Sequence, residues 1–250
     1  MSAQRGGSSS ERAWPLQSAH PEPRSAKGRP VSSVRAVLFD LDGTLVDSAP
    51  DLAAAANAMR IARGQEPLPF SHLRPHVGSG ARGMLGAAFA QAPGQPGYEA
   101  LRDEFLQRYE TCMLQQTRRF DAVAAVLDAL DHAGLPWGIV TNKALRFAEP
   151  VARATALWPR AAALVGGDST PHTKPHPAPL LEAARRLGQA PQACVYVGDD
   201  PRDMQAGKAA GMRTLAAAWG YLGTASAIEQ WGADEVLAHP QALLTWLELA

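Results

Sequence analysis

The hydrophobic positions of the chain fall into short apolar runs that alternate with longer stretches of helical spacing. Short runs rich in β-branched residues are typical of buried strands, whereas apolar residues three and four positions apart predict amphipathic helices. The strands are expected at residues 36–39, 137–140, 162–165, 194–197 and 213–217. Because helical segments separate these strands, the pattern predicts an α/β protein whose Rossmann-like parallel sheet is covered by helices on both faces.

The segment after the first strand carries helical patterns over about seventy residues without a strand pattern among them. In an alternation of strands and helices such a segment is an insertion, and we expect it to form a helical cap over the site. Its helices are expected at 51–63, 73–89 and 98–113, and those of the core at 123–133, 147–157, 177–187, 204–210 and 240–249. The predicted domains are a tail at 1–33, a core made of 34–47 and 120–250, and the cap at 48–119.

Residues 1–33 are rich in Ser, Gly, Pro and Arg and have no sustained apolar period. A segment of this composition buries too little apolar surface to offset its conformational entropy, so we expect it to be disordered. Its bias resembles that of a transit peptide, and a start site placed too far upstream explains it equally well. Neither a secretory signal nor a membrane-spanning run is expected.

Composition and charge argue against several classes of protein. A chain of 250 residues with 46% hydrophobic content can bury a sizeable core in one or two domains. Its 24 basic and 24 acidic residues balance, which gives no reason to expect nucleic acid or a membrane surface as a partner. Two cysteines, Cys112 and Cys194, are too few for a disulfide framework. We therefore expect a cytoplasmic monomer or homodimer that acts on a small molecule.

Two carboxylates, Asp40 and Asp42, come directly after the first predicted strand. Side chains two positions apart in extended backbone point the same way, so the pair emerges at the strand's carboxyl end, where open α/β sheets keep their sites. The two carboxylates of such a pair can bind a cation together, or one can act as a nucleophile while the other acts as a general acid. Gly43 would let the chain bend, and Thr44 offers a hydroxyl and an N–H to a phosphate. An acidic turn without a function is the alternative, and an EF-hand is excluded because its closing Glu is missing.

Polar residues also follow the second and third predicted strands. Thr141 and Asn142 come after the second strand, where a hydroxyl and N–H groups can bind a phosphate, although the same dipeptide also forms plain turns. Lys174 lies in a loop that two prolines stiffen, and a fixed ammonium there would balance the charge of a phosphate and a carboxylate. A solvated loop lysine is the alternative interpretation.

An acidic cluster follows the fourth predicted strand. Asp199, Asp200 and Asp203 stand at a tight turn that opens a helix, and Mg²⁺ prefers a few carboxylates of this kind. Helix capping by Asp explains the same pattern. The stronger argument for a functional site is that the motifs occur together. The acidic pair, the threonine, the lysine and the acidic cluster all fall at the ends of successive strands and would meet along one sheet edge.

Taken together, these motifs resemble those of phosphatases of the haloacid dehalogenase (HAD) superfamily, over residues 34–250. The four motifs are residues 40–44, Thr141, Lys174-Pro175 and residues 198–203. The resemblance implies a HAD-like core in which Asp40 is the nucleophile that forms an aspartyl-phosphate and Asp42 is the general acid and base. Dehalogenases of the superfamily lack an acid at the second position of the pair, so Asp42 indicates phosphate chemistry.

The same resemblance assigns the remaining polar residues. Mg²⁺ would be held by Asp40, the main-chain carbonyl of Asp42 and Asp199. Asp203 would support these ligands, and Asp200 would act through a water. The transferring phosphoryl group would be bound by Thr141 and Lys174, and the positions of Thr44 and Asn142 after the strands make them further candidates for phosphate binding.

The helical insertion resembles the cap of the phosphoglycolate phosphatase-like branch, and residues 78–82 resemble its specificity loop. Arg82 is expected to read the substrate, because a guanidinium pairs well with a carboxylate; an ordinary surface arginine is the alternative. Residues 80–84, 141–150 and 231–234 also resemble phosphatases of N-acetylmuramic acid 6-phosphate. The implied activity is hydrolysis of 2-phosphoglycolate, with N-acetylmuramic acid 6-phosphate or a phosphomutase reaction as alternatives.

Overall fold

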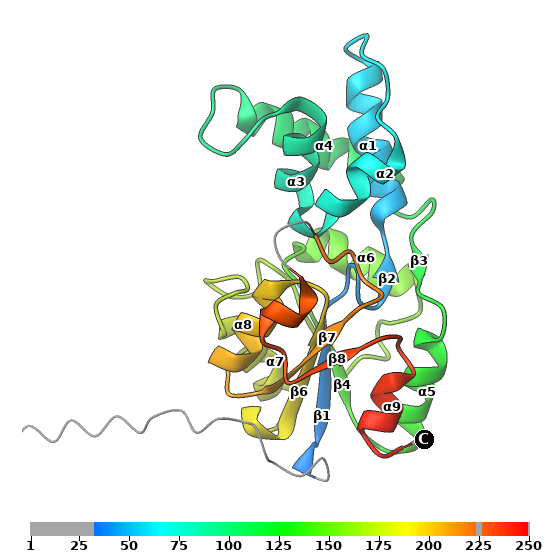
Figure 1. Cartoon of the computed structure of the whole chain (residues 1–250), viewed down its shortest axis with the longest axis vertical. Coiled ribbons are helices and arrows are strands. Elements are labelled where there is room, and N and C mark those ends of the chain that lie inside the picture. Colours follow the sequence, from blue (N-terminus) through cyan, green and yellow to red (C-terminus); the bar gives the residue numbers. More distant parts are fainter. Residues whose placement is uncertain (1–32, 224–226, 250) are drawn as a thin grey trace, which may run out of the picture.

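A six-stranded parallel sheet forms the centre of the computed structural model, which describes residues 33–223 and 227–249 (Figure 1). The strands are β1 (Ala36–Phe39), β4 (Trp137–Val140), β5 (Ala163–Val165), β6 (Cys194–Gly198), β7 (Arg213–Ala217) and β8 (Glu235–Leu237). Their order is β5-β4-β1-β6-β7-β8, and every neighbouring pair is parallel. The five expected strands are confirmed. Sequence analysis missed β8, a three-residue edge strand with two exposed positions.

A layer of helices lies above the carboxyl ends of the strands (Figure 1). It consists of α1 (Ala49–Ile61), α2 (Phe70–Leu73), the 3₁₀ segment η2 (Arg74–Ser79), α3 (Gly80–Phe89) and α4 (Tyr98–Cys112). The prediction of one helix at 73–89 is wrong. Pro75 lies in the first turn of η2, and Gly80 has φ +56° and ψ −141°, so the chain changes direction before α3 begins.

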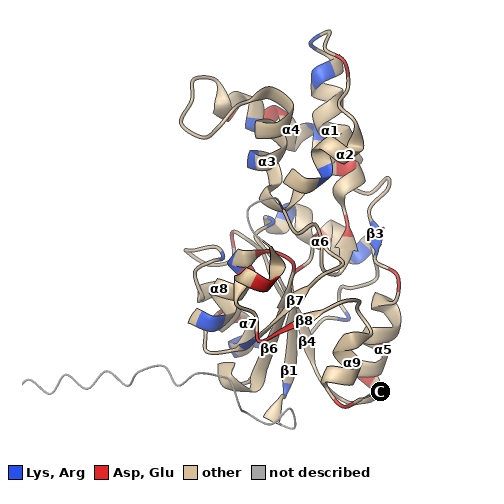
Figure 2. Ribbon diagram, viewed as in Figure 1, with Lys and Arg blue, Asp and Glu red and all other residues tan. Residues whose placement is uncertain are grey.

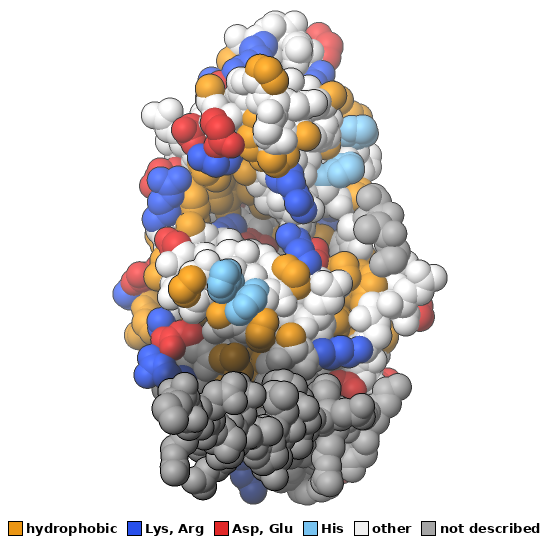
Figure 3. Space-filling view, turned by 90° about the vertical axis from the view of Figure 1, so that its left-hand side faces the viewer, with side chains coloured by type: hydrophobic (Ala, Val, Ile, Leu, Met, Phe, Trp, Pro, Cys, Tyr) orange, Lys and Arg blue, Asp and Glu red, His pale blue; other side chains and the backbone are white. Residues whose placement is uncertain are grey.

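Charged residues of both signs are spread over the helical layer and the sheet layer (Figure 2). This distribution agrees with the balanced composition. The space-filling view shows a hollow between the two layers, with Lys and Arg side chains at its edge (Figure 3). Among the described residues, none of the helices has both the length and the apolar character needed to cross a membrane. Residues 1–32, which hold nearly all of the predicted tail, lie outside the part of the chain that is described.

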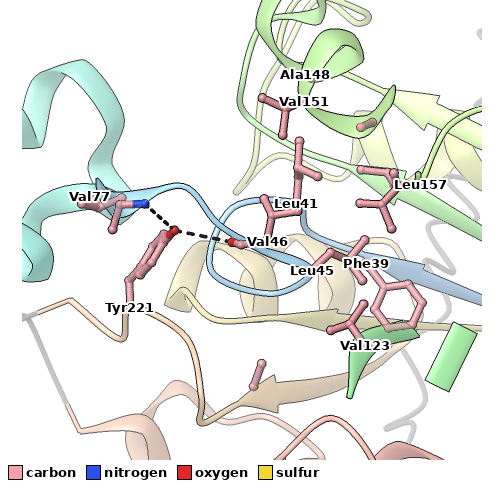
Figure 4. Close-up of a cluster of buried hydrophobic side chains, with 14 of the residues drawn as sticks. Phe39, Leu41, Leu45, Val46, Val77, Val123, Ala148, Val151, Leu157 and Tyr221 are labelled. Atoms are coloured by element: carbon pink, nitrogen blue, oxygen red, sulfur yellow. Dashed lines mark hydrogen bonds between the residues drawn. The ribbon is translucent and has the colours of Figure 1, made fainter. Parts of the chain in front are cut away.

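The sheet buries both of its faces. Val37 and Phe39 of β1 join one hydrophobic cluster, whereas Ala36 and Leu38 join another, as the two-residue period of a strand requires. Figure 4 shows Phe39 and Val123 in the first of these clusters. That face is covered by α5 (Val123–His132), α6 (Leu145–Ala154) and α9 (Ala242–Trp246), and the opposite face by α7 (Ala178–Arg186) and α8 (Pro201–Ala209).

Two short strands, which the sequence pattern did not reveal, connect the layers. β2 (Val46–Asp47) pairs antiparallel with β3 (Arg118–Arg119), so the chain enters and leaves the helical layer side by side. The hydroxyl of Tyr221 accepts the N–H of Ser48 at 2.7 Å. It also lies 3.5 Å from the carbonyl of Val46 (Figure 4). The boundaries that we expect for the cap, residues 48 and 119, fall at the ends of this pair of strands. That the helical layer is a separate cap domain stays a proposal.

The helix α8 begins at Pro201, three residues before the expected start at 204. Asp200 caps it: its carboxylate accepts the N–H of Arg202 at 2.9 Å, and Asp203 accepts the N–H of Asp200 at 3.1 Å. This capping box satisfies N–H groups that have no partner within the helix. The other core helices begin and end within three residues of their expected bounds.

Candidate active site

Three neighbouring strands bring the predicted site residues to one edge of the sheet. Asp40 follows β1, Thr141 follows β4 and Asp199 follows β6, and the sheet order places β1 between the other two. Lys174 comes from the loop after β5. Because the strands are parallel, their carboxyl ends lie side by side, which is why residues up to 160 positions apart in sequence can meet here.

Lys174 is the cation at the centre of the site. Its Nζ lies 3.0 Å from Oδ1 of Asp40 and 2.7 Å from Oδ1 of Asp203, and the residue is 4% exposed. Burial alone would lower the pKa of Lys174, but the charges of Asp203 and Asp40 outweigh it and raise the pKa. The ammonium also donates to the hydroxyl of Tyr196 at 2.7 Å. Lys174 therefore stays charged and fixed beside the predicted nucleophile.

Asp40, Asp199 and Asp203 form the acidic cluster of the site. One carboxylate oxygen of each lies within 4.8 Å of the others. Burial raises the pKa of Asp40 to about 7, although Lys174 opposes the shift. Burial, together with the charge of Asp40, raises the pKa of Asp199 well above its ordinary value. The single ammonium of Lys174 does not balance the three carboxylates, two of which are buried, when all of them are ionised. A further positive charge would be needed to keep all three in the charged form.

A divalent cation fits this cluster. Carboxylate oxygens are the donors that Mg²⁺ prefers, and the cation would supply the missing positive charge. Asp199 is held in place tightly: a Cβ added at Gly43, which has φ +86°, or at Gly220 would clash with its side chain. Asp203 lies in the same cluster as Asp40 and Asp199, and its carboxylate contacts Lys174 at 2.7 Å and accepts the N–H of Asp200 at 3.1 Å. The supporting role that we expect for it stays a prediction.

Magnesium is expected to raise the melting temperature of the protein. An ion present at about 100 times its Kd stabilises the folded state by about 2.7 kcal/mol, which corresponds to a few degrees for a chain of this size. Asp199→Asn removes one ligand and should abolish most of the shift. Glu110→Gln, at an exposed position of α4, is the matched control and should retain it. Identical wild-type melting curves in excess Mg²⁺ and in a chelator would contradict the metal site.

Asp42 has partners that sequence analysis did not identify. Its Oδ1 lies 2.9 Å from Nζ of Lys143 and also accepts the hydroxyl of Ser48. Lys143 donates to the hydroxyl of Tyr109 on α4 at 2.9 Å, which links Asp42 to the helical layer. Burial lowers the pKa of Lys143, but the charge of Asp42 overcompensates and raises it. Lys143 stands two positions after Thr141, which could have indicated that it lies near the site. Nothing in the sequence pattern indicated Tyr109.

Three predicted residues make contacts other than the expected ones. The hydroxyl of Thr44, which we expected at the phosphate, donates instead to Oδ1 of Asp199 at 2.9 Å. The side-chain amide of Asn142 pairs with the backbone N–H and carbonyl of Lys174 at 2.9 and 3.0 Å, so it positions the lysine loop. Asp200 caps α8 and pairs with Arg202 at 2.7 Å. These hydrogen bonds hold parts of the site together, and the expected contacts of the three residues with a phosphate or a metal-bound water stay predictions.

A cavity of about 360 Å³ opens above the cluster, between the sheet layer and the helical layer. Asp40, Asp42, Thr141 and Lys174 are among the polar residues that line it. Its apolar wall comes mainly from the helical layer and consists of Leu52, Val77, Ala81, Phe105, Leu106, Tyr109 and, from α6, Phe147. The cavity therefore has a charged floor and an apolar wall, an arrangement suited to a phosphorylated organic molecule.

Arg82 does not lie on the wall of the cavity. Arg82 is exposed and is not among the residues that line the cavity, although its neighbours at 78–81 are. Two other arginines line the cavity instead, Arg146 on α6 and Arg202 on α8. Arg202 pairs with Asp200 and donates to the carbonyl of Gly78 at 2.7 Å, so it contacts the helical layer.

The fold and the site define a class of protein that comparison with known families confirms. The sequence-family model of the haloacid dehalogenase-like hydrolases matches residues 34–211, and the chain belongs to this family. A predicted phosphoglycolate phosphatase from Haemophilus somnus has the same fold, with a TM-score of 0.75, 26% identity, and coverage of 85% of this chain and 97% of that chain.

Two curated relatives are more similar in sequence. A phosphoglycolate phosphatase of Xanthomonas campestris is 49% identical over 210 residues, which cover 84% of this chain and 94% of the relative. An N-acetylmuramic acid 6-phosphate phosphatase of Pseudomonas aeruginosa is 42% identical over 217 residues, which cover 87% and 96%. These relatives confirm the expected class of enzyme, a phosphoric monoester hydrolase.

Proposed function

We propose that the protein is a Mg²⁺-dependent phosphomonoesterase that works through an aspartyl-phosphate on Asp40. The observation that carries this proposal is the ion pair of Asp40 with Lys174, at 3.0 Å, beside the acidic cluster and on the floor of the cavity. A carboxylate next to a buried ammonium can attack a phosphoryl group whose charge that ammonium offsets. When bound, Mg²⁺ would neutralise phosphoryl oxygens and so reduce their repulsion of the nucleophile.

The orientation of Asp40 supports its role as the nucleophile. Its Oδ1 accepts the N–H of Leu41 at 2.7 Å and the ammonium of Lys174. Within the described part of the chain, Oδ2 is therefore the oxygen left to attack phosphorus. Asp42 also lines the cavity and would protonate the leaving alkoxide, then deprotonate the water that hydrolyses the aspartyl-phosphate. The hydroxyl of Thr141 would donate to the phosphoryl oxygens.

Two hydrogen bonds hold the helical layer closed over the cavity. Lys143 reaches Tyr109 at 2.9 Å, and Arg202 reaches the carbonyl of Gly78 at 2.7 Å. Closure excludes bulk water while Asp40 attacks, so that the phosphoryl group passes to the enzyme first. Opening would then admit the hydrolytic water and release the alcohol product.

The leading candidate for the substrate is 2-phosphoglycolate, because the relative at 49% identity carries that name. N-Acetylmuramic acid 6-phosphate is the second candidate. The size of the cavity favours it: about 360 Å³ with an apolar wall is enough for a ligand larger than a two-carbon acid. The relative that is named for this activity is 42% identical. Both candidates carry a carboxylate in addition to the phosphate.

A phosphate-release assay tests the proposed reaction. Both candidate esters and a chromogenic aryl phosphate are incubated with the enzyme in Mg²⁺ or in a chelator, with no bisphosphorylated activator present. We expect Mg²⁺-dependent release of phosphate, with kcat/KM of roughly 10⁴ M⁻¹s⁻¹ or more for the preferred ester. Product that forms only with a bisphosphorylated activator would indicate a phosphomutase, and no turnover of any ester would refute the proposal.

The proposal places the enzyme in the cytoplasm, as a monomer or homodimer. Both of its cysteines, Cys112 and Cys194, are free thiols in the structure, which is the usual state in a reducing compartment.

A further inference from the structure

Four cationic side chains line the cavity among the described residues, and one of them, Arg146, stands apart. The other three have carboxylate partners, namely Lys143 with Asp42 at 2.9 Å, Lys174 with Asp40 at 3.0 Å and Arg202 with Asp200 at 2.7 Å. Arg146 has no carboxylate partner in the described part of the chain. Its charge is therefore available to a ligand in the cavity.

The guanidinium of Arg146 is held in place by an aromatic ring. It lies 4.4 Å from the ring centroid of Phe147, which also lines the cavity and is buried. The ring of Phe147 is fixed in turn by Tyr109, whose centroid is 5.7 Å away. A guanidinium stacked on a ring keeps its N–H groups at the edge, where they can form two parallel hydrogen bonds with a carboxylate.

Arg146 lies at the rim of the cavity. The residue is exposed and still lines the cavity, whereas Asp40 and Lys174 are on its floor. Lys and Arg side chains are visible at the edge of the hollow in the space-filling view (Figure 3). A ligand whose phosphate reaches the floor would thus place its other end near Arg146.

We propose that Arg146 is the residue that selects substrates carrying a carboxylate, by binding that carboxylate at the rim while the phosphate lies on the floor. This inference rests on the proposed phosphatase function and deepens it. It assigns to Arg146 the role that the sequence suggested for Arg82. The geometry supports the change because Arg146 lines the cavity and Arg82 does not. Arg146 takes no part in the transfer of the phosphoryl group.

The test compares esters with and without the group that carries the carboxylate. N-Acetylmuramic acid 6-phosphate is paired with N-acetylglucosamine 6-phosphate, which lacks the lactyl group, and 2-phosphoglycolate is paired with ethyl phosphate. For Arg146→Gln, we expect KM for the carboxylate-bearing substrate to rise about 10- to 100-fold, the usual effect of losing a charge-assisted pair. KM for the neutral partner and kcat for both should stay within about twofold. For Arg146→Lys, KM for the carboxylate-bearing substrate should lie between the values of the wild type and of Arg146→Gln. A lysine keeps the positive charge but cannot form two parallel hydrogen bonds with the carboxylate.

Arg82→Gln is the matched control, since it removes an exposed arginine outside the cavity, and it should change none of these values. Melting curves establish that each variant is folded. If Arg146→Gln impairs both members of a pair equally, or neither, Arg146 does not select the carboxylate although the phosphatase function stands. The same holds if the wild type hydrolyses both members of each pair equally well. If the wild type hydrolyses none of the four esters, the proposed function fails and this inference fails with it.

Discussion

The Asp40→Asn variant is expected to lose turnover almost completely, with kcat lower by roughly 10⁴-fold or more. An amide has nearly the shape of the carboxylate but cannot attack phosphorus, so the aspartyl-phosphate would not form. The change should be tolerated structurally, because it removes a charge from a crowded acidic cluster where burial already raises the pKa of Asp40 to about 7. Phosphate release from the preferred ester measures the effect.

Asp42→Asn is the comparison for this experiment. It should retain phosphoryl capture and slow the two proton-transfer steps. With the chromogenic aryl phosphate, whose leaving group departs without a proton from Asp42, single-turnover measurements should show release of the phenol without release of free phosphate. The Asp40→Asn variant should show neither event. Activity of a folded Asp40→Asn protein within tenfold of the wild type would exclude a nucleophilic role for Asp40.

The Lys174→Met variant is expected to lose both activity and stability. Activity should fall about 10²- to 10³-fold, because no ammonium would offset the charge of the phosphoryl group. Without Mg²⁺, the folded state should lose about 3–5 kcal/mol, the usual result of leaving buried carboxylates without their cation. In the wild type Lys174 contacts both Asp40 and Asp203, so its removal leaves two carboxylates uncompensated.

Denaturant unfolding in a chelator at two pH values measures this loss. Burial raises the pKa of Asp40 above its value in the unfolded chain, and the folded state of such an acid loses stability as the pH rises. Lys174→Met should therefore lower the free energy of unfolding more at pH 8 than at pH 5. These pH values lie on either side of the pKa of Asp40, which is about 7. Lys208→Met, at an exposed position of α8, should cost less than about 0.5 kcal/mol at both values. Equal stability of the Lys174 and Lys208 variants at pH 8 would contradict the buried ion pairs.

The sheet could be predicted from sequence because strands that are buried on both faces leave continuous apolar runs. All five expected strands are present, and the carboxyl ends of β1, β4 and β6 lie together as the motifs required. The meeting of Asp40, Thr141 and Asp199 follows from this topology alone, whereas Lys174 is positioned by a loop that the side chain of Asn142 holds. Strand β8 gave no such signal, since an edge strand with exposed positions has little apolar patterning.

Hydrogen-bond partners and side-chain directions could not be predicted in the same way. Thr44 and Asn142 were recognised as polar residues at the right place, but whether a hydroxyl or amide reaches a phosphate or a neighbouring residue depends on spacings that sequence does not give. Sequence analysis proposed Arg82 as the cation near the cavity and did not single out Arg146, which lines the cavity in the structure. The phase of each helix decides which of its side chains face the cavity, and the sequence pattern did not fix that phase closely enough. The prediction of one helix at 73–89 took no account of Pro75 and Gly80, two residues that signal a break in a helix.

The most direct test is to locate the phosphoryl group on the enzyme. The Asp42→Asn variant is mixed with the chromogenic aryl phosphate, whose leaving group needs no proton from Asp42, and with Mg²⁺; it is then quenched with acid during turnover, digested and analysed by mass spectrometry. Because the general base is missing, the phosphorylated enzyme should accumulate, and the modified peptide should carry the phosphoryl group on Asp40. A phosphoryl group on any other residue, or an unmodified enzyme that still releases product, would contradict the assignment of Asp40 as the nucleophile.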